Sequence, residues 1–138
     1  MQGMNAGNDP AHYRTYGLYL SKQVREELEG HLYDEAGVVD LEAYFDPSAS
    51  TIPAGDPGAA VTHELLSSVV TDFATLYDAA DFAAAEALDH DTFALTHVAA
   101  EPETVAAARE RFEAATIIQE TDLRTVHTAV LEARLASE

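Results

Sequence analysis

Glycine is confined to the first part of this sequence, and that distribution constrains the fold more than any other feature. All seven glycines fall at or before Gly58, and residues 59–138 contain no glycine and a single proline, Pro102. Alanine, the best helix former, is abundant in the same stretch, whereas glycine and proline are the main helix breakers. We therefore expect an all-α fold, a helical bundle of about four to six helices with a long C-terminal helical segment.

The whole chain, residues 1–138, is predicted to be one domain with three parts. Residues 1–45 are expected to be helical, residues 46–58 form a loop with three of the five prolines, and residues 59–138 are the glycine-free part. Asp9-Pro10 is typical of a helix start, and apolar residues recur at helical spacing from Tyr13 to Leu28, with Gly30 as the stop. Gly17 would then lie inside this helix, where a close helix crossing would explain it.

Further helix starts are indicated by aspartates that can act as N-caps. Asp56-Pro57 begins the clearest helix, whose apolar face runs from Val61 to Tyr77. Capping acids before apolar segments predict additional helices at 82–88 and 92–99, and the short apolar segment 38–45 fits a helix or a strand, of which we favour the helix. Pro102 opens the last segment, which continues to Ala136 either as one rod or as two helices broken at residues 120–122.

Acidic residues dominate the charge of the chain. There are 25 Asp and Glu residues against seven Lys and Arg, a formal net charge of −18, and residues 26–108 contain no Lys or Arg. This charge disfavours direct binding to nucleic acid or to anionic lipid, because both depend on basic side chains. Self-repulsion at low ionic strength destabilises such a domain, and molar salt screens most of that repulsion.

The composition resembles that of proteins from salt-in halophilic archaea and their viruses. The features that carry the resemblance are the abundant acids, the single lysine (Lys22), the many Ala and Thr residues and only three isoleucines. It implies monovalent cations at the acidic surface, and a high-salt cytoplasm or a virion as the location. An acidic protein from a high-GC genome is the alternative, and a decoy for a basic partner is a third interpretation.

Several classes of protein are disfavoured by what the sequence lacks. Cysteine is absent, which excludes thiol catalysis, disulfides and thiolate metal sites. No apolar run approaches the length of a membrane span, and the first residues lack the apolar core of a secretion signal. We expect neither membrane insertion nor secretion.

Histidine is the main source of candidate chemistry. Glu86 and His90 are four residues apart and could share a helix face, and Asp89-His90-Asp91 with His97 is the densest polar cluster. Two histidines seven residues apart on a helix are separated by about 10 Å, too far to bind one metal. No serine lies in a Gly-x-Ser-x-Gly elbow, and no glycine-rich phosphate loop is present. We therefore expect no catalytic, cofactor-binding or metal-binding residues.

Tyrosines near the N-terminus suggest an interface instead. Tyr13, Tyr16 and Tyr19 lie within seven residues, beside Arg14, and tyrosine is enriched at protein interfaces. On a helix, Tyr16 and Tyr19 would sit adjacent on one face. We predict that Tyr13, Arg14, Tyr16 and Tyr19 form an intermolecular contact.

These observations favour a non-enzymatic structural or interaction subunit of a larger assembly in a salt-in halophile, with a head–tail virion component as one concrete case. Its partners would be proteins, as a homo-oligomer or a larger complex. One alternative is a small metal-binding or enzymatic helical bundle that uses Glu86, His90 and His97. Another is a cytoplasmic regulator that acts through protein contacts.

Overall fold

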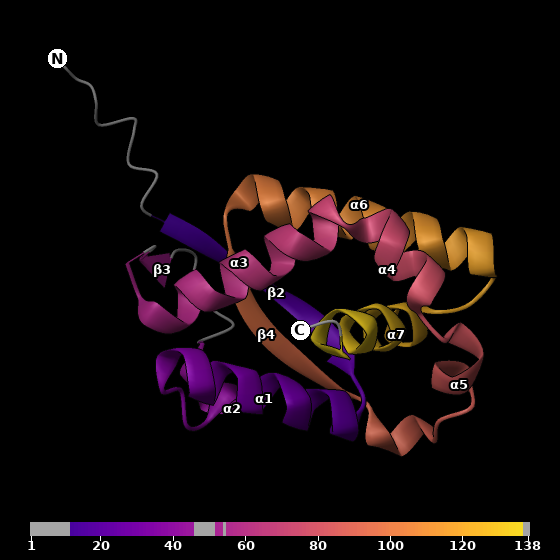
Figure 1. Ribbon diagram of the computed structural model, residues 1–138, viewed down its shortest axis with the longest axis horizontal. Helices are drawn as coiled ribbons and strands as arrows, with labels where there is room; N and C mark the ends of the chain where they lie inside the picture. Colours follow the sequence, from indigo (N-terminus) through magenta and orange to yellow (C-terminus); the bar gives the residue numbers. More distant parts are fainter. Residues whose placement is uncertain (1–11, 46–51, 54, 137–138) are drawn as a thin grey trace, which may run out of the picture.

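The protein is mixed α/β, so the all-α prediction is wrong. The computed structural model describes residues 12–45, 52–53 and 55–136. Within these residues a three-stranded antiparallel sheet has the order β3-β2-β4, formed by β2 (His12–Leu20), β3 (Ile52–Pro53) and β4 (Ala94–Ala100). Figure 1 shows β2 and β4 running through the middle of the molecule, with α3, α4 and α6 on one side and α1 and α2 on the other.

Strand β2 occupies the first half of the segment that was predicted to be one helix. Burial alternates along it, with Tyr16, Leu18 and Leu20 buried and the residues between them more exposed. That two-residue period is the signature of a strand with one face in the core. The Asp9-Pro10 helix start lies outside the described residues.

Helix α1 (Lys22–Ala36) begins where β2 ends. Ser21 is its N-cap and accepts a hydrogen bond from the backbone N–H of Val24. The helix passes through Gly30 without stopping and ends at Gly37, whose φ of 71° is the left-handed conformation that glycine adopts easily. The predicted stop was therefore seven residues early.

Strand β4 replaces the helix predicted over 92–99. It pairs with β2 along its whole length, from Ala94 opposite Leu20 to Ala100 opposite Arg14. Just before it, Asp89 accepts a hydrogen bond from the N–H of Asp91 and caps a short 3-10 turn, η2 (His90–Thr92). Asp91 therefore lies inside a turn instead of capping a helix.

The Asp56-Pro57 start is confirmed. Helix α3 (Pro57–Thr71) has Asp56 as its N-cap, and the carboxylate accepts a hydrogen bond from the N–H of Ala59. The same carboxylate accepts a hydrogen bond from the hydroxyl of Tyr44, which lies in the short helix α2 (Leu41–Tyr44) predicted in this region. Gly58 is required here, because a Cβ would lie 2.4 Å from the Tyr44 ring.

The remaining helices begin near their predicted starts, but one that was expected to be continuous is divided. The helix predicted through Tyr77 is divided at Asp72 into α3 and α4 (Phe73–Ala79). Asp81 caps α5 (Phe82–Glu86) by accepting from the N–H of Ala84. The long C-terminal segment, left open as one helix or two, is two: α6 (Pro102–Gln119) and α7 (Leu123–Ala136). Glu120 between them has a left-handed φ of 53°.

Two helices cover the parts of the outer edges of β2 and β4 that no strand pairs with. On α3, the buried Thr62 hydroxyl donates to the carbonyl of Ala99 (2.7 Å) and accepts from its N–H (3.1 Å), so the outer edge of β4 is hydrogen-bonded to a helix side chain. On α7, His127 accepts the N–H of Tyr19 through Nδ1 (3.0 Å), and Thr128 donates to its carbonyl (3.2 Å). A strand edge of this kind would otherwise be open to pairing with another chain.

Candidate functional site

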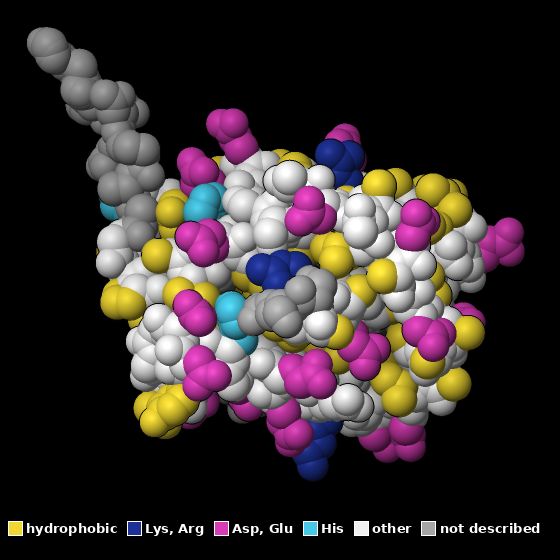
Figure 2. All heavy atoms as spheres, in the orientation of Figure 1, with side chains coloured by type: hydrophobic (Ala, Val, Ile, Leu, Met, Phe, Trp, Pro, Cys, Tyr) yellow, Lys and Arg dark blue, Asp and Glu magenta, His cyan; other side chains and the backbone are white. Residues whose placement is uncertain are grey.

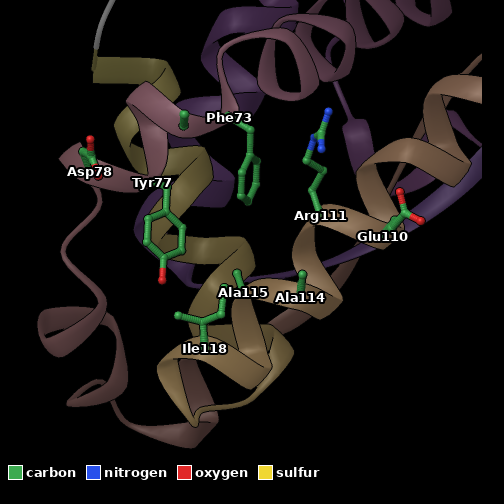
Figure 3. A pocket seen from close by; sticks show the side chains of 9 residues that line it. Phe73, Tyr77, Asp78, Glu110, Arg111, Ala114, Ala115 and Ile118 are labelled. Atoms are coloured by element: carbon green, nitrogen blue, oxygen red, sulfur yellow. The ribbon is translucent and has the colours of Figure 1, made fainter.

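An open, mainly apolar groove lies between α4 and α6. It has a volume of about 510 Å³, and its lining is Phe73, Ala74, Tyr77, Asp78, Glu110, Arg111, Ala114, Ala115 and Ile118. Figure 3 shows Phe73 and Tyr77 projecting from α4 toward α6, with Ala114, Ala115 and Ile118 facing them from α6. The groove is therefore walled by aromatic rings and has small side chains on its floor.

The core holds the walls of the groove in place. Phe73 packs edge-to-face against the fully buried Phe112 at a centroid distance of 5.9 Å, and Tyr77 packs against Phe82 at 5.1 Å. The Tyr77 hydroxyl also accepts a hydrogen bond from the side-chain amide of Gln119, which ties α4 to the end of α6. Because both rings are anchored, the groove is pre-formed.

Apolar surface continues beyond the groove along α6. Ile117 is 77% exposed and Ile118 68% exposed, although both are large apolar side chains. Figure 2 shows yellow apolar side chains gathering at the end of the molecule where α4, α5 and the end of α6 lie in Figure 1. Exposed apolar surface around a groove is typical of a protein-binding site.

The rest of the surface is acidic. None of the Asp and Glu side chains that the structure describes is buried. Figure 2 shows these carboxylates spread over the visible face, with few bases among them. The groove therefore lies in a highly charged, well-solvated surface.

The structure separates the four residues of the predicted interface. Tyr16 is buried, with its ring near Phe112 and the Arg109 guanidinium 5.7 Å from its centroid, and burial raises the pKa of its hydroxyl to about 12. Tyr13 is half-buried and its ring lies 4.8 Å from that of His63. Of the four side chains, only those of Arg14 and Tyr19 are exposed, and Tyr19 is 43% exposed. The interface stays a prediction, but the four side chains do not share one helical face.

The candidate metal ligands are distributed over separate elements. Glu86 accepts a hydrogen bond from the Thr121 hydroxyl, and His90 Nε2 lies 2.7 Å from a guanidinium nitrogen of Arg124. Arginine can only donate, so Nε2 of His90 is an acceptor whose lone pair is occupied. His97 lies on β4, opposite Gly17. Across the described ranges, no three His, Asp or Glu side chains gather closely enough to bind a metal ion.

His127 is the buried titratable group that sequence reasoning missed. It is 1% exposed, and its ring lies 4.6 Å from Phe112, so burial lowers its pKa to about 4. With Nδ1 accepting from Tyr19, the ring proton is on Nε2, which has no hydrogen-bond partner. It contributes to the core and does not line the groove.

Comparisons with known proteins add no identification: no family model, curated protein or solved structure matches the chain. In the part of the chain that the structure describes, no helix combines the length and hydropathy needed to cross a bilayer. The groove itself was not predicted. The adjacent pair Ile117-Ile118, which is exposed on α6 beside the groove, was not singled out in the sequence.

Proposed function

We propose that this protein is a non-enzymatic interaction subunit that docks a protein partner in the groove between α4 and α6. The observation that carries the proposal is the apolar surface shared by the groove and the exposed Ile117 and Ile118. Covering an exposed isoleucine with a partner is favourable, by about 1.5–3 kcal/mol for a side chain that becomes fully buried.

A macromolecular partner fits this surface better than a small ligand. A volume of about 510 Å³ is within the range of small-molecule pockets. However, Ile117 does not line the groove, and a small ligand inside the groove would leave it exposed. A protein segment lying along α6 would cover both isoleucines and fill the groove.

Site-specific photo-crosslinking tests the proposal in the cells that make the protein. A photoreactive phenylalanine analogue is placed at Ile117, beside the groove, or at Ala106, which is also exposed on α6 but does not line the groove. We expect a discrete crosslinked species from position 117 only, and we expect Ile118→Glu to reduce it. Equal crosslinking from both positions, or none from position 117, would contradict the proposal.

The high-salt setting is part of this proposal. The solvated carboxylates and the net charge of −18 support a protein whose folded state needs screening by salt. A high-salt cytoplasm or a virion is the location we propose. Its test is a thermal melt followed by circular dichroism between about 0.1 and 2 M KCl, in which the melting temperature should rise most steeply over the first molar. A constant melting temperature would remove this part of the proposal.

A further inference from the structure

We propose that Arg111 selects the partner of this groove. The docked segment is an amphipathic helix that places apolar side chains on the alanine floor and a carboxylate against the Arg111 guanidinium. This inference rests on the proposed function, because it names the partner chemistry of the same groove.

Arg111 is an uncommitted base in a chain with few bases. The sequence has seven Lys and Arg against 25 Asp and Glu. Arg109 lies over the Tyr16 ring, and Arg124 pairs with Asp122 at 3.1 Å. Within the described residues, Arg111 has no hydrogen bond, ion pair or ring contact, although it lines the groove. An unpaired guanidinium offers several donors suited to a carboxylate.

The other two charged residues of the lining point elsewhere. Figure 3 shows the Arg111 side chain rising past Phe73 between α4 and α6. Asp78 and Glu110 lie on opposite flanks of the groove and point away from it. Arg111 is therefore the charged side chain that reaches between the two helices, whereas the two carboxylates of the lining lie at its flanks.

The shape of the groove favours a helix as the occupant. Its walls are two helices, and a third helix can pack its side chains into the space between them. Ala74 and Ala114 are both exposed and leave room for large apolar side chains from the partner. A carboxylate next to the apolar stripe of such a helix would then meet Arg111.

Three synthetic helical peptides of about sixteen residues test this pairing. They share one leucine stripe and carry Glu, Gln or Lys at the positions beside it. Binding to the whole protein is measured by fluorescence anisotropy at about 0.5 M KCl, where the Debye length of about 4 Å screens long-range repulsion but not a contact pair. We expect the Glu peptide to bind about fivefold more tightly than the Gln peptide, and the Lys peptide more weakly than both.

The variants locate the effect. Arg111→Gln should abolish the preference for Glu over Gln, and Arg111→Glu should reverse it in favour of the Lys peptide. Arg14→Gln removes another exposed base, on β2, and should leave the preference unchanged. Both positions are exposed, so circular dichroism should show the same fold and similar melting temperatures for the three variants.

Each contrary outcome points to a different error. Equal binding of the three peptides, unchanged by Arg111→Gln, would overturn the role of Arg111 and leave the docking groove in place. Binding of none of them would overturn the helical partner, and the photo-crosslinking result would then decide the proposed function alone. Saturable binding of decanoate that requires Arg111, without peptide binding, would replace the protein partner by a small amphipathic carboxylate.

Discussion

Helix side chains hydrogen-bond to the backbone at both outer edges of the β2–β4 pair, but the chemical groups differ between the two edges. At the β4 edge, one threonine hydroxyl of α3 serves both backbone groups of Ala99. At the β2 edge, α7 uses two side chains for Tyr19, the His127 imidazole for its N–H and the Thr128 hydroxyl for its carbonyl. A hydroxyl keeps its protonation state across the physiological range, whereas an imidazole does not. The comparison predicts one edge that is insensitive to pH and one that acid weakens.

The largest effect is expected at the β4 edge. Thr62→Val keeps the shape of the side chain but leaves the buried N–H and C=O of Ala99 without their partner. Each unsatisfied buried group costs about 1–3 kcal/mol, so the free energy of unfolding should fall by about 3 kcal/mol. Urea denaturation at constant KCl measures it, with the exposed Thr75→Val as the matched control. A loss below about 1 kcal/mol would mean that water replaces the hydroxyl at this edge.

Acid should weaken the β2 edge and leave the β4 edge unchanged. The pKa of His127 is lowered to about 4 in the folded protein, against an ordinary value of 6.5. The unfolded chain therefore binds a proton that the folded chain does not, and stability is fully present above about pH 6.5 and lost as the pH falls toward 4. At pH 5, His127 should lower the free energy of unfolding by about 2 kcal/mol relative to neutral pH.

Comparison with His127→Phe isolates this contribution from the carboxylates. The free energies of unfolding of both proteins are measured between about pH 7 and 5, and their difference reports His127 alone. Thr62→Val should follow the pH dependence of the unaltered chain. If the difference between the unaltered protein and His127→Phe is constant over this range, the imidazole is not held neutral by burial.

At neutral pH, His127→Phe should have a smaller effect than Thr62→Val. The substitution removes the acceptor of the Tyr19 N–H, but it also removes the buried Nε2–H that has no partner. These two terms oppose each other, so we expect a loss of about 1 kcal/mol. With the acid effect, the variant should be the less stable protein at pH 7 and the more stable one at pH 5. Unfolding curves of the unaltered protein and of the variant, measured at both pH values, check this reversal.

The parts of the fold that were predictable from sequence depend on local chemistry. The Asp56-Pro57 start and the cap of α5 by Asp81 involve only hydrogen bonds to residues three positions along the chain. A long helical C-terminal segment was also expected, and Asp122 proves to be its internal cap, accepting from the N–H of Thr125. The aspartates at these positions act within a single turn, so the sequence contains the whole interaction.

The strands were not predictable in the same way, because their partners are remote. In β2, Tyr13, Tyr16 and Leu20 fit a helical period, whereas Tyr16, Leu18 and Leu20 fit a strand. Pairing with β4, about eighty residues later, decides in favour of the strand. The alanines of β4 would themselves favour a helix in isolation. Two further helices also favour the strands, because Thr62 and His127 on these helices hydrogen-bond to the strand backbone. The groove likewise exists only once α4 and α6 are packed, so the local patterns that predict helix caps do not predict it.

The smallest effect is expected inside the ladder, at Gly17. A helix crossing was the predicted reason for this glycine, but it lies on β2, opposite His97. A Cβ there would lie 2.8 Å from Leu95 Cδ1, the end of a flexible side chain that is 47% exposed. Leu95 can rotate into solvent, and alanine restricts the unfolded chain more than glycine does. Gly17→Ala should therefore change the free energy of unfolding by less than about 0.5 kcal/mol, in contrast to Thr62→Val. Urea denaturation under the same conditions measures it. A loss of about 2 kcal/mol or more would show that Leu95 is held in place, and that the exposed face of the ladder is as sensitive to substitution as its covered edges.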